Sequence, residues 1–322
     1  MTPPWWQELI RAGAVPGSGS RSDEPEAVET AELVEGGELQ AHPVPAQTRI
    51  PRASFLNGME RWGVRAYDGV IPLVDAYIAA AVRRRDERGI LHTTAVRSRS
   101  FAVAAVASMT AALRESLEGA AADIEPVDDE FVGQPAKYLE QVESIVRRAR
   151  AHLERELAEA AIEDLGADEW LVLDGRLSRS PGVARHPRAL GVIKSHGAQF
   201  LEGRGLERAL TLPAGHRTSV FAVRGGHTRT ETHSWYLRLW PWEGNDLLYG
   251  LLRIEARAHA DTVARASEIS AWLWAERAPL ATPAARWDRL LYPLHQVEEY
   301  LKALAPRELH AQRASRLPRT GT

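Results

Sequence analysis

The chain has 322 residues, a formal net charge of −3 and no cysteine, which excludes disulfides, thiolate chemistry and cysteine-based zinc sites. Hydrophobic residues make up 44% and charged residues 26%, as is typical of a globular chain with a sizeable core. No apolar run is long enough to span a membrane, and the start, MTPPWWQELI, lacks the features of a signal peptide, so we expect a cytoplasmic protein with no membrane association.

Residues 1–48 are predicted to form an N-terminal helix and a flexible or extended arm. The helix, at residues 1–13, carries two tryptophans, and residues 14–48 are rich in Gly, Ser, Pro and Glu. An aromatic end on a polar tether is typical of docking to a partner, and packing on the chain's own domain is an equal alternative. At the other end, residues 306–322 are predicted to form a basic tail.

Residues 49–305 are predicted to form one α/β domain with a central mixed sheet. The first strands are expected in ASFLNG and WGVRAYDG, where Asn57-Gly58 and Asp68-Gly69 indicate consecutive hairpins. The clearest helix covers residues 137–164, because apolar residues recur there at steps of three and four. Further strands are predicted in EWLVLDGRL, ALGVIKSHG, TSVFAVRGG, HSWYLRLW and LLYGLLRIEA, followed by helices at residues 260–276 and 286–304.

Two carboxylates among these predicted elements are candidates for a functional site. Asp174 closes an apolar strand, where a charge is costly unless it is paired or bound to a metal. Glu156 lies at the edge of the apolar stripe of the long helix, so packing of that helix on the sheet could bring it near Asp174. Clustered carboxylates suit a Mg²⁺ or Mn²⁺ site for phosphodiester cleavage, and an ordinary Asp-Gly corner is the structural alternative. Lys194 ends the next strand, where it could contact a phosphate or remain an ordinary exposed lysine.

Taken together, the segments resemble the NurA family of nucleases, which have an RNase H-like fold and work with HerA-type hexameric DNA translocases. The resemblance is to the bacterial type. Its motifs follow one another in the same order as in the family and span about 250 residues. Its motifs are FLNG at 55–58, ERELAEAA at 154–161, LVLDGRL at 171–177, GVIKS at 191–195, YGLLRIE at 249–255 and LYPLHQVEEY at 291–300. It implies an RNase H-like mixed sheet flanked by helices, with additional C-terminal helices.

The resemblance also implies a metal site for Mn²⁺ or Mg²⁺. Its ligands would correspond to Asn57, Glu156 and Asp174, with Glu154 as the neighbouring option for the helix glutamate. Lys194 is the candidate phosphate contact. A C-terminal tyrosine of the family corresponds to Tyr292, whereas the matching histidine is replaced by Glu298 or Glu299, and His295 lies one turn early.

Asn57 departs from the family, which has an aspartate there. An amide can bind a metal through its oxygen, but it brings no negative charge, so metal binding should weaken severely. Three accounts are open: a substitution made in an active enzyme, a naturally disabled subunit, or replacement of the missing charge by Asp68. We favour the first two, since Asp68 is expected at the far end of its strand.

The resemblance further implies a homodimer on a HerA-type hexameric ATPase, with DNA as substrate in end processing or in defence against foreign DNA. The translocase would supply the positive channel that the net charge of −3 does not provide. Two alternatives belong to other classes. One is a non-catalytic NurA-like subunit that binds and regulates the ATPase; the other, a guide-dependent protein of the Argonaute PIWI type, would need a more basic surface.

Overall fold

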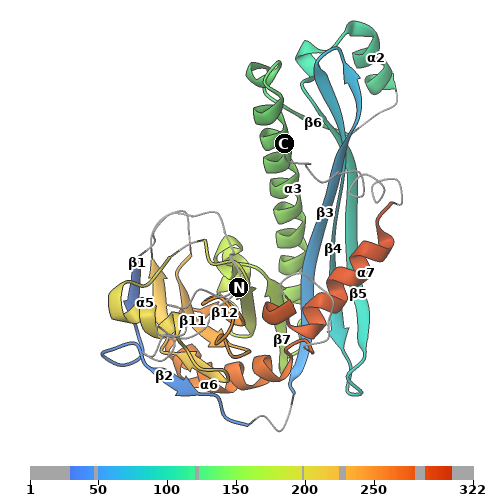
Figure 1. The fold of residues 1–322 in the computed structure, drawn as a ribbon. Coiled ribbons are helices and arrows are strands. Elements are labelled where there is room, and N and C mark those ends of the chain that lie inside the picture. Colours follow the sequence, from blue (N-terminus) through green and yellow to red (C-terminus); the bar gives the residue numbers. More distant parts are fainter. Residues whose placement is uncertain are drawn as a thin grey trace, which may run out of the picture. The chain divides into compact units, whose positions relative to one another are not determined.

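The computed structural model describes residues 30–46, 50–119, 123–197, 199–224, 230–279 and 287–306. They form an α/β protein with a large mixed sheet of 12 strands flanked by helices (Figure 1), which confirms the predicted mixed α/β class. The chain divides into two compact units. The described residues of the first unit lie within Met1–Phe55, Arg85–Gly89 and Ile162–His295, and those of the second within Leu56–Arg84, Ile90–Ala161 and Gln296–Thr322.

The first unit is built around strands that neighbour one another in the order β1, β10, β11, β12, β8 and β7, and β9 links β2 to β11. These pairings are antiparallel except that of β7 with β8, which is parallel. Strands β7, β8, β11 and β12 are buried along almost their whole length, which is why β7 and β8 read as apolar runs, whereas β11 and β12 also bury polar and charged side chains. The bounds are β1 (Thr30–Leu33), β2 (Ala41–Pro43), β7 (Glu169–Asp174), β8 (Ala189–Ile193), β9 (His216–Thr218), β10 (Phe221–Arg224), β11 (Thr232–Arg238) and β12 (Leu251–Arg257).

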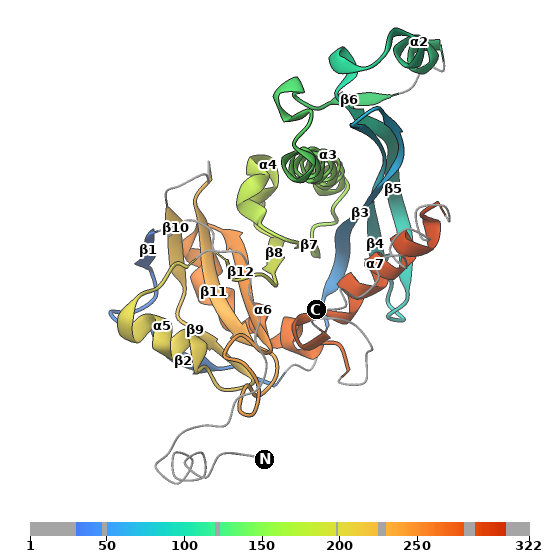
Figure 2. The same cartoon turned by 45° about the horizontal axis from the view of Figure 1, so that its top comes forward.

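Helices of the first unit cover this part of the sheet. Helix α6 packs on β11 (Figure 2), where the indole nitrogen of the fully buried Trp235 donates a hydrogen bond to Ser270 Oγ at 2.9 Å. This hydrogen bond gives a partner to a polar group that would otherwise be buried without one. The bounds are η3 (Leu177–Arg179), α4 (Pro181–Ala184), α5 (Gly203–Leu210), α6 (Ala260–Ala275) and η4 (Trp287–Arg289), followed by α7 (Tyr292–Leu304), which continues into the second unit.

Part of the predicted N-terminal arm belongs to the sheet. Strand β1 pairs with β10, and β2 pairs with β9, so two stretches of this segment are extended and hydrogen-bonded within the first unit. The predicted helix at residues 1–13 and the basic tail from residue 307 onward lie outside the described residues. The division of residues 49–305 into a single domain stays a prediction.

The second unit contains a run of long strands in the order β3, β4, β5 and β6, and β5 pairs with β6 in parallel. Helix α3 runs beside these strands in both Figure 1 and Figure 2. It matches the helix predicted for residues 137–164, except that it begins two residues before that range and ends one residue earlier. The bounds are β3 (Arg52–Asp68), β4 (Ile71–Arg85), β5 (Leu91–Ala104), β6 (Ile124–Pro126), η1 (Val106–Ser108), α2 (Ala111–Gly119), η2 (Asp129–Phe131) and α3 (Pro135–Glu163).

The turn predicted at Asn57-Gly58 is wrong. Strand β3 continues through this pair for 17 residues and ends in a tight turn at Gly69, where φ is +59°. Gly58 does not adopt the left-handed backbone that a hairpin turn needs; instead, a Cβ on it would lie 2.0 Å from Glu154 Oε1 of α3. The glycine therefore serves close packing of a helix on a strand.

A hydrophobic core holds α3 on the strands of the second unit. It is formed by alternate residues of β4, including Val74, Ala76 and Ile78, and by one stripe of α3, including Val142 and Val146. No helix among the described ranges is long and apolar enough to cross a membrane.

The side chain of Tyr138 makes two hydrogen bonds within this core. We expect Tyr138→Phe to lower the free energy of unfolding of the second unit by about 1–3 kcal/mol. The buried phenol oxygen accepts from Ala105 N at 2.9 Å and donates to Pro72 O at 3.0 Å, so its loss leaves two buried backbone groups without a partner. Hydrogen exchange of the α3 amides measures the effect. Tyr67→Phe is the control, because Tyr67 is 65% exposed and should change protection little.

Candidate active site

The carboxyl ends of two parallel strands bring Asp174 and Lys194 together in the first unit. Strands β7 and β8 pair so that Asp174 lies opposite Val192, which puts Lys194 just beyond the end of the ladder. Asp174 Oδ2 accepts a hydrogen bond from Lys194 Nζ at 2.6 Å, and the two side chains are 14% and 18% exposed. The two residues predicted separately from the sequence therefore form one partly shielded ion pair at the carboxyl ends of adjacent strands, a common place for functional groups.

Two glycines shape the loop that leaves Asp174. Gly175 has a φ of +136°, a backbone conformation that residues other than glycine rarely adopt. Gly191 lies in the middle of β8, and a Cβ on it would lie 2.6 Å from Gly175 O and 2.8 Å from Leu177 N. The loop after Asp174 consequently crosses directly over the backbone of the neighbouring strand.

A buried ion pair on β12 also holds this loop, because Glu255 lies opposite Gly191 in the strand register. Glu255 and Arg253, which are 1% and 2% exposed, are joined by Oε1 and Nη1 at 2.7 Å. Glu255 Oε2 also accepts a hydrogen bond from Ser178 N at 3.1 Å, a few residues after Asp174. Sequence reasoning missed this pair, although a visible signal was present: two opposite charges two residues apart in an apolar strand share one face of the sheet.

Arg289 supports the lysine. It is fully buried and donates a hydrogen bond from Nη1 to the backbone oxygen of Lys194. The predicted site residue Tyr292 also belongs to the first unit; it begins α7 and is 46% exposed. The fold thus fixes the backbone around Lys194 by contacts that the sequence did not reveal.

In the second unit, the face of α3 that meets β3 carries Glu154, not Glu156. Glu154 packs against Gly58 and lies 3.4 Å from Arg150 Nε, which is also 3.6 Å from Glu60 Oε2. Glu156 has a side chain that is 45% exposed, and its oxygens lie 3.8 Å from Arg97 Nη1 and 3.3 Å from His152 Nε2. The helix therefore favours Glu154, the neighbouring option, as the glutamate that faces the strand.

The remaining predicted residues lie in the second unit as well. Asn57 is 6% exposed, and its Oδ1 accepts a hydrogen bond from Gly58 N at 2.8 Å. Glu298 lies on α7 with Oε1 2.9 Å from Lys302 Nζ. Asp68, the proposed substitute for the missing charge, accepts a hydrogen bond from Thr110 N at 2.6 Å near the start of α2.

The predicted metal set is divided between the units, with Asp174 in the first and Asn57 and Glu156 in the second. Within the part of the chain that the structure describes, no group of three or more Asp, Glu and His residues is arranged to hold a metal ion. Asp174 still supplies a carboxylate oxygen of the kind that Mn²⁺ and Mg²⁺ prefer. The Mn²⁺ or Mg²⁺ cofactor stays a prediction.

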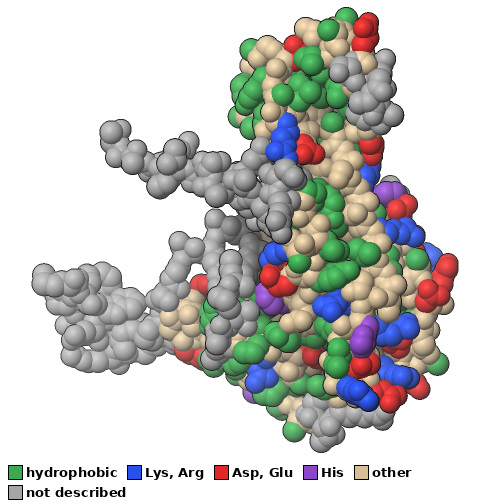
Figure 3. All heavy atoms as spheres, turned by 90° about the vertical axis from the view of Figure 1, so that its right-hand side faces the viewer, with side chains coloured by type: hydrophobic (Ala, Val, Ile, Leu, Met, Phe, Trp, Pro, Cys, Tyr) green, Lys and Arg blue, Asp and Glu red, His purple; other side chains and the backbone are tan. Residues whose placement is uncertain are grey.

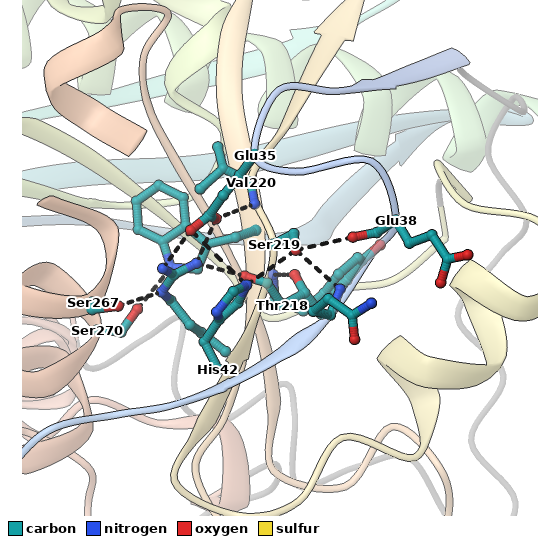
Figure 4. Close-up of polar contacts among 12 residues, drawn as sticks. Glu35, Glu38, His42, Thr218, Ser219, Val220, Ser267 and Ser270 are labelled. Atoms are coloured by element: carbon teal, nitrogen blue, oxygen red, sulfur yellow. Dashed lines mark hydrogen bonds and ion pairs between the residues drawn. The ribbon is translucent and has the colours of Figure 1, made fainter. Parts of the chain in front are cut away.

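A second polar cluster ties residues 35–42 to β9 and to the residues between β9 and β10 in the first unit (Figure 4). Arg217 of β9 donates two hydrogen bonds to Glu35, at 2.7 and 2.8 Å, and its Nε donates to Ser267 Oγ at 2.9 Å. His42 Nε2 lies 3.1 Å from Ser219 Oγ and 3.9 Å from Glu35 Oε1. Because one ring nitrogen makes both contacts, this is not the relay of a catalytic triad, in which acid and nucleophile take opposite nitrogens. The cluster of Glu35, His42, Arg217 and Ser219, called the clamp below, therefore holds the N-terminal segment against the sheet.

We expect the clamp to contribute less stability to the N-terminal segment at acidic pH. Burial alone would raise the pKa of Glu35, but hydrogen bonds from Arg217 and Val220 N outweigh it and lower that pKa; burial and Arg217 lower the pKa of His42. Both pKa values in the folded protein lie below the ordinary values of 4.5 and 6.5, so the unfolded segment takes up protons first as the pH falls. Stability contributed by His42 declines below pH 6.5, and that contributed by Glu35 declines below pH 4.5.

Hydrogen exchange of residues 30–46, corrected for intrinsic rates, measures this effect at neutral and acidic pH. Glu35→Gln should remove the loss of protection below pH 4.5. The loss that begins below pH 6.5 should remain, because burial and Arg217 still lower the pKa of His42. Glu38→Gln is the matched control, because the side chain of Glu38 is 72% exposed and its pairing with Arg208 is at the surface. Equal loss of protection in β7 and β8 would contradict a local clamp.

No protein-family model matches the chain, and comparison with curated proteins gives no match.

Proposed function

We propose that the chain is a metal-dependent DNA nuclease subunit of the NurA type that works with a HerA-type hexameric ATPase. The observation that carries the proposal is the Asp174–Lys194 pair, 2.6 Å apart at the carboxyl ends of adjacent parallel strands. A carboxylate beside an ammonium group suits phosphodiester chemistry, since one can hold a cation and the other can face a phosphate oxygen.

The residues of the first unit would contribute as follows. Asp174 would hold Mn²⁺ or Mg²⁺, and the bound ion would activate water and stabilise the leaving oxygen. Lys194 would orient the scissile phosphate and offset its charge. The buried Glu255 and Arg289 would keep the loop after Asp174 and the backbone of Lys194 in place.

The order of elements supports an RNase H-like fold. Strands β3, β4 and β5 follow one another in the chain and are neighbours in the sheet; α2, β6 and α3 come next, and β7 then carries Asp174 at its carboxyl end. The NurA-like motifs FLNG, ERELAEAA and LVLDGRL lie in β3, in α3 and at β7, respectively.

An apolar end of the second unit supports a protein partner. Tyr67 and Val70 flank the β3–β4 turn and are 65% and 67% exposed, and Leu113 of the nearby α2 is 37% exposed. Figure 3 shows hydrophobic side chains gathered at this end of the unit. Exposed apolar patches of this kind mark interaction sites, and we assign this one to the ATPase.

Cleavage of linear DNA in the presence of Mn²⁺ tests the proposal. We expect Asn57→Asp to cleave, alone or with its ATPase, and the double variant Asn57→Asp, Asp174→Asn to lose the activity. Lys194→Met in the Asn57→Asp background should lower the cleavage rate about 10²–10³-fold, the usual effect of removing one group that stabilises developing charge. Failure of Asn57→Asp to cleave in either setting would overturn the enzymatic proposal.

A non-catalytic subunit is the second candidate, and Asn57 is the observation that favours it. The amide brings no charge to the predicted metal site, and Asp174 already has a cationic partner. This candidate predicts stimulation of the ATPase by the chain with no Mn²⁺ bound at Asp174. Titration of the chain with Mn²⁺, followed by the ATPase assay, separates the two functions.

A further inference from the structure

Asn57 and Gly58 place a reactive pair of groups side by side within β3. Gly58 N lies 2.8 Å from Asn57 Oδ1 and donates a hydrogen bond to it. The carbonyl carbon Cγ is one bond from that oxygen, so the backbone nitrogen lies close to the side-chain carbon that it could attack. Reactions between groups held in such proximity are strongly accelerated.

Packing requires a glycine at position 58. A Cβ at Gly58 would lie 2.0 Å from Glu154 Oε1, 2.7 Å from its Cδ and 2.8 Å from its Cγ. Glycine also leaves the backbone nitrogen unhindered, because it has no side chain to shield that nitrogen from Cγ of the preceding residue. The contact with α3 therefore keeps in place the residue that makes a preceding asparagine most reactive.

We propose that Asn57 is a modification site that converts to aspartate by intramolecular deamidation. Gly58 N loses its proton and forms a bond to Asn57 Cγ, the bond between Cγ and the amide nitrogen breaks, and ammonia leaves. Water then adds to Cγ of the cyclic imide, the bond between Cγ and Gly58 N breaks, and the backbone N–H is restored. The net change is hydrolysis of one side-chain amide by one water molecule.

The strand selects between the two products of ring opening. Opening at Cγ restores the original backbone, whereas opening at the backbone carbonyl inserts an extra methylene into the main chain. An inserted methylene breaks the regular repeat of about 3.3 Å per residue on which strand pairing depends. Asn57 lies inside a strand that continues for eleven residues beyond it, to Asp68, so the normal aspartate is the product that the fold accommodates.

The modification places a negative charge at a position that is 6% exposed. A carboxylate with so little access to water favours capture of a cation. If the chain is a nuclease as proposed above, deamidation would supply a carboxylate at the position where the NurA resemblance implies a metal ligand, so activity would grow as the protein ages. That consequence rests on the proposed function, whereas the chemical conversion does not.

Mass spectrometry of the full-length chain, incubated under native conditions at mildly alkaline pH, tests the conversion. Peptides that contain Asn57 should gain the mass that marks replacement of an amide by a carboxyl group. Asn245 is the internal control, because it is the other asparagine of the chain and precedes Asp246 in place of glycine. We expect conversion at Asn57 to be faster than at Asn245 by about tenfold or more, because the glycine after Asn57 leaves the attacking nitrogen unhindered and close to the side chain.

Two comparisons make the outcome decisive. Asn57→Gln should keep its amide, since its longer side chain cannot close the five-membered ring, and Asn57→Asp provides the fully converted reference. Retention of the Asn57 amide in the native chain while the denatured chain or Asn245 converts would overturn the proposal. Conversion by mass with no gain of Mn²⁺-dependent cleavage, in a chain whose Asn57→Asp variant is also inactive, would instead overturn the proposed function alone.

Discussion

Replacing Arg238 with methionine is expected to lower the free energy of unfolding of the first unit by about 4 kcal/mol, since each buried acceptor left without a donor costs about 1–3 kcal/mol. Arg238 is fully buried near the end of β11. Its guanidinium donates to Leu212 O at 3.1 Å, Leu210 O at 2.6 Å and Leu247 O at 3.1 Å, and also to Tyr249 O. Methionine fills similar volume but supplies no donor.

The position of this arginine explains why the loss should be large. One of its acceptors, Leu210 O, lies at the carboxyl end of α5, where helix carbonyls have no partner within the helix and a nearby cation is favourable; Leu212 O lies just beyond that end. The other two belong to the loop that leads into β12. Burial lowers the pKa of Arg238 to about 10, so the group remains charged at neutral pH. One side chain therefore joins a helix end, a strand and a loop.

Urea denaturation followed by tryptophan fluorescence measures the effect on the first unit. Arg204→Met is the matched control, because Arg204 lies on the exposed side of α5 and should change stability by less than about 0.5 kcal/mol. Arg238→Lys should rescue only part of the loss, since a single ammonium cannot reach four carbonyls in fixed positions. A midpoint for Arg238→Met within the range of the Arg204→Met control would contradict the role given to Arg238.

Elements with strong periodicity were predictable from the sequence. The stripe on α3 and the apolar runs at β7, β8, β11 and β12 all fall where the hydrophobic pattern indicates, because burial on one face or on both faces dictates residue type directly. The pairing of Asp174 with Lys194 then follows from one further fact, the parallel alignment of β7 with β8, which aligns their carboxyl ends.

The errors arose where local chemistry and tertiary packing compete. Asn57-Gly58 has the composition of a hairpin turn, yet Gly58 serves contact with Glu154 from a helix almost a hundred residues away, which no local pattern reveals. The choice of Glu156 over Glu154 has a similar cause. Two residues correspond to about 200° around a helix, so a small error in register selects the opposite face. The structural role of the buried pair of Arg253 and Glu255 was missed because it depends on a hydrogen bond from Ser178, which is distant in the sequence.

Gly191→Ala is expected to lower the free energy of unfolding by about 3 kcal/mol, at the upper end of the range for overpacking in a core. The added methyl would lie 2.6 Å from Gly175 O, 2.8 Å from Leu177 N and 3.1 Å from Leu177 Cβ. Two of these are backbone atoms of the loop that follows Asp174, and backbone cannot rotate away as a flexible side chain would. The loop must move as a whole, which pulls on the hydrogen bond from Ser178 N to Glu255 and displaces Asp174 from Lys194.

Gly205→Ala provides the matched control, because a Cβ at this α5 glycine meets no atom within 4 Å. There the same change should stabilise the chain by about 0.5–1 kcal/mol, through the reduced freedom of the unfolded state and the better helix propensity of alanine. Urea denaturation measures both variants, and hydrogen exchange of residues 175–178 reports whether the loop is the part that moves. Protection of that loop at the wild-type level in Gly191→Ala, with stability lost elsewhere, would contradict the crossing of the loop over β8 as the support of Asp174.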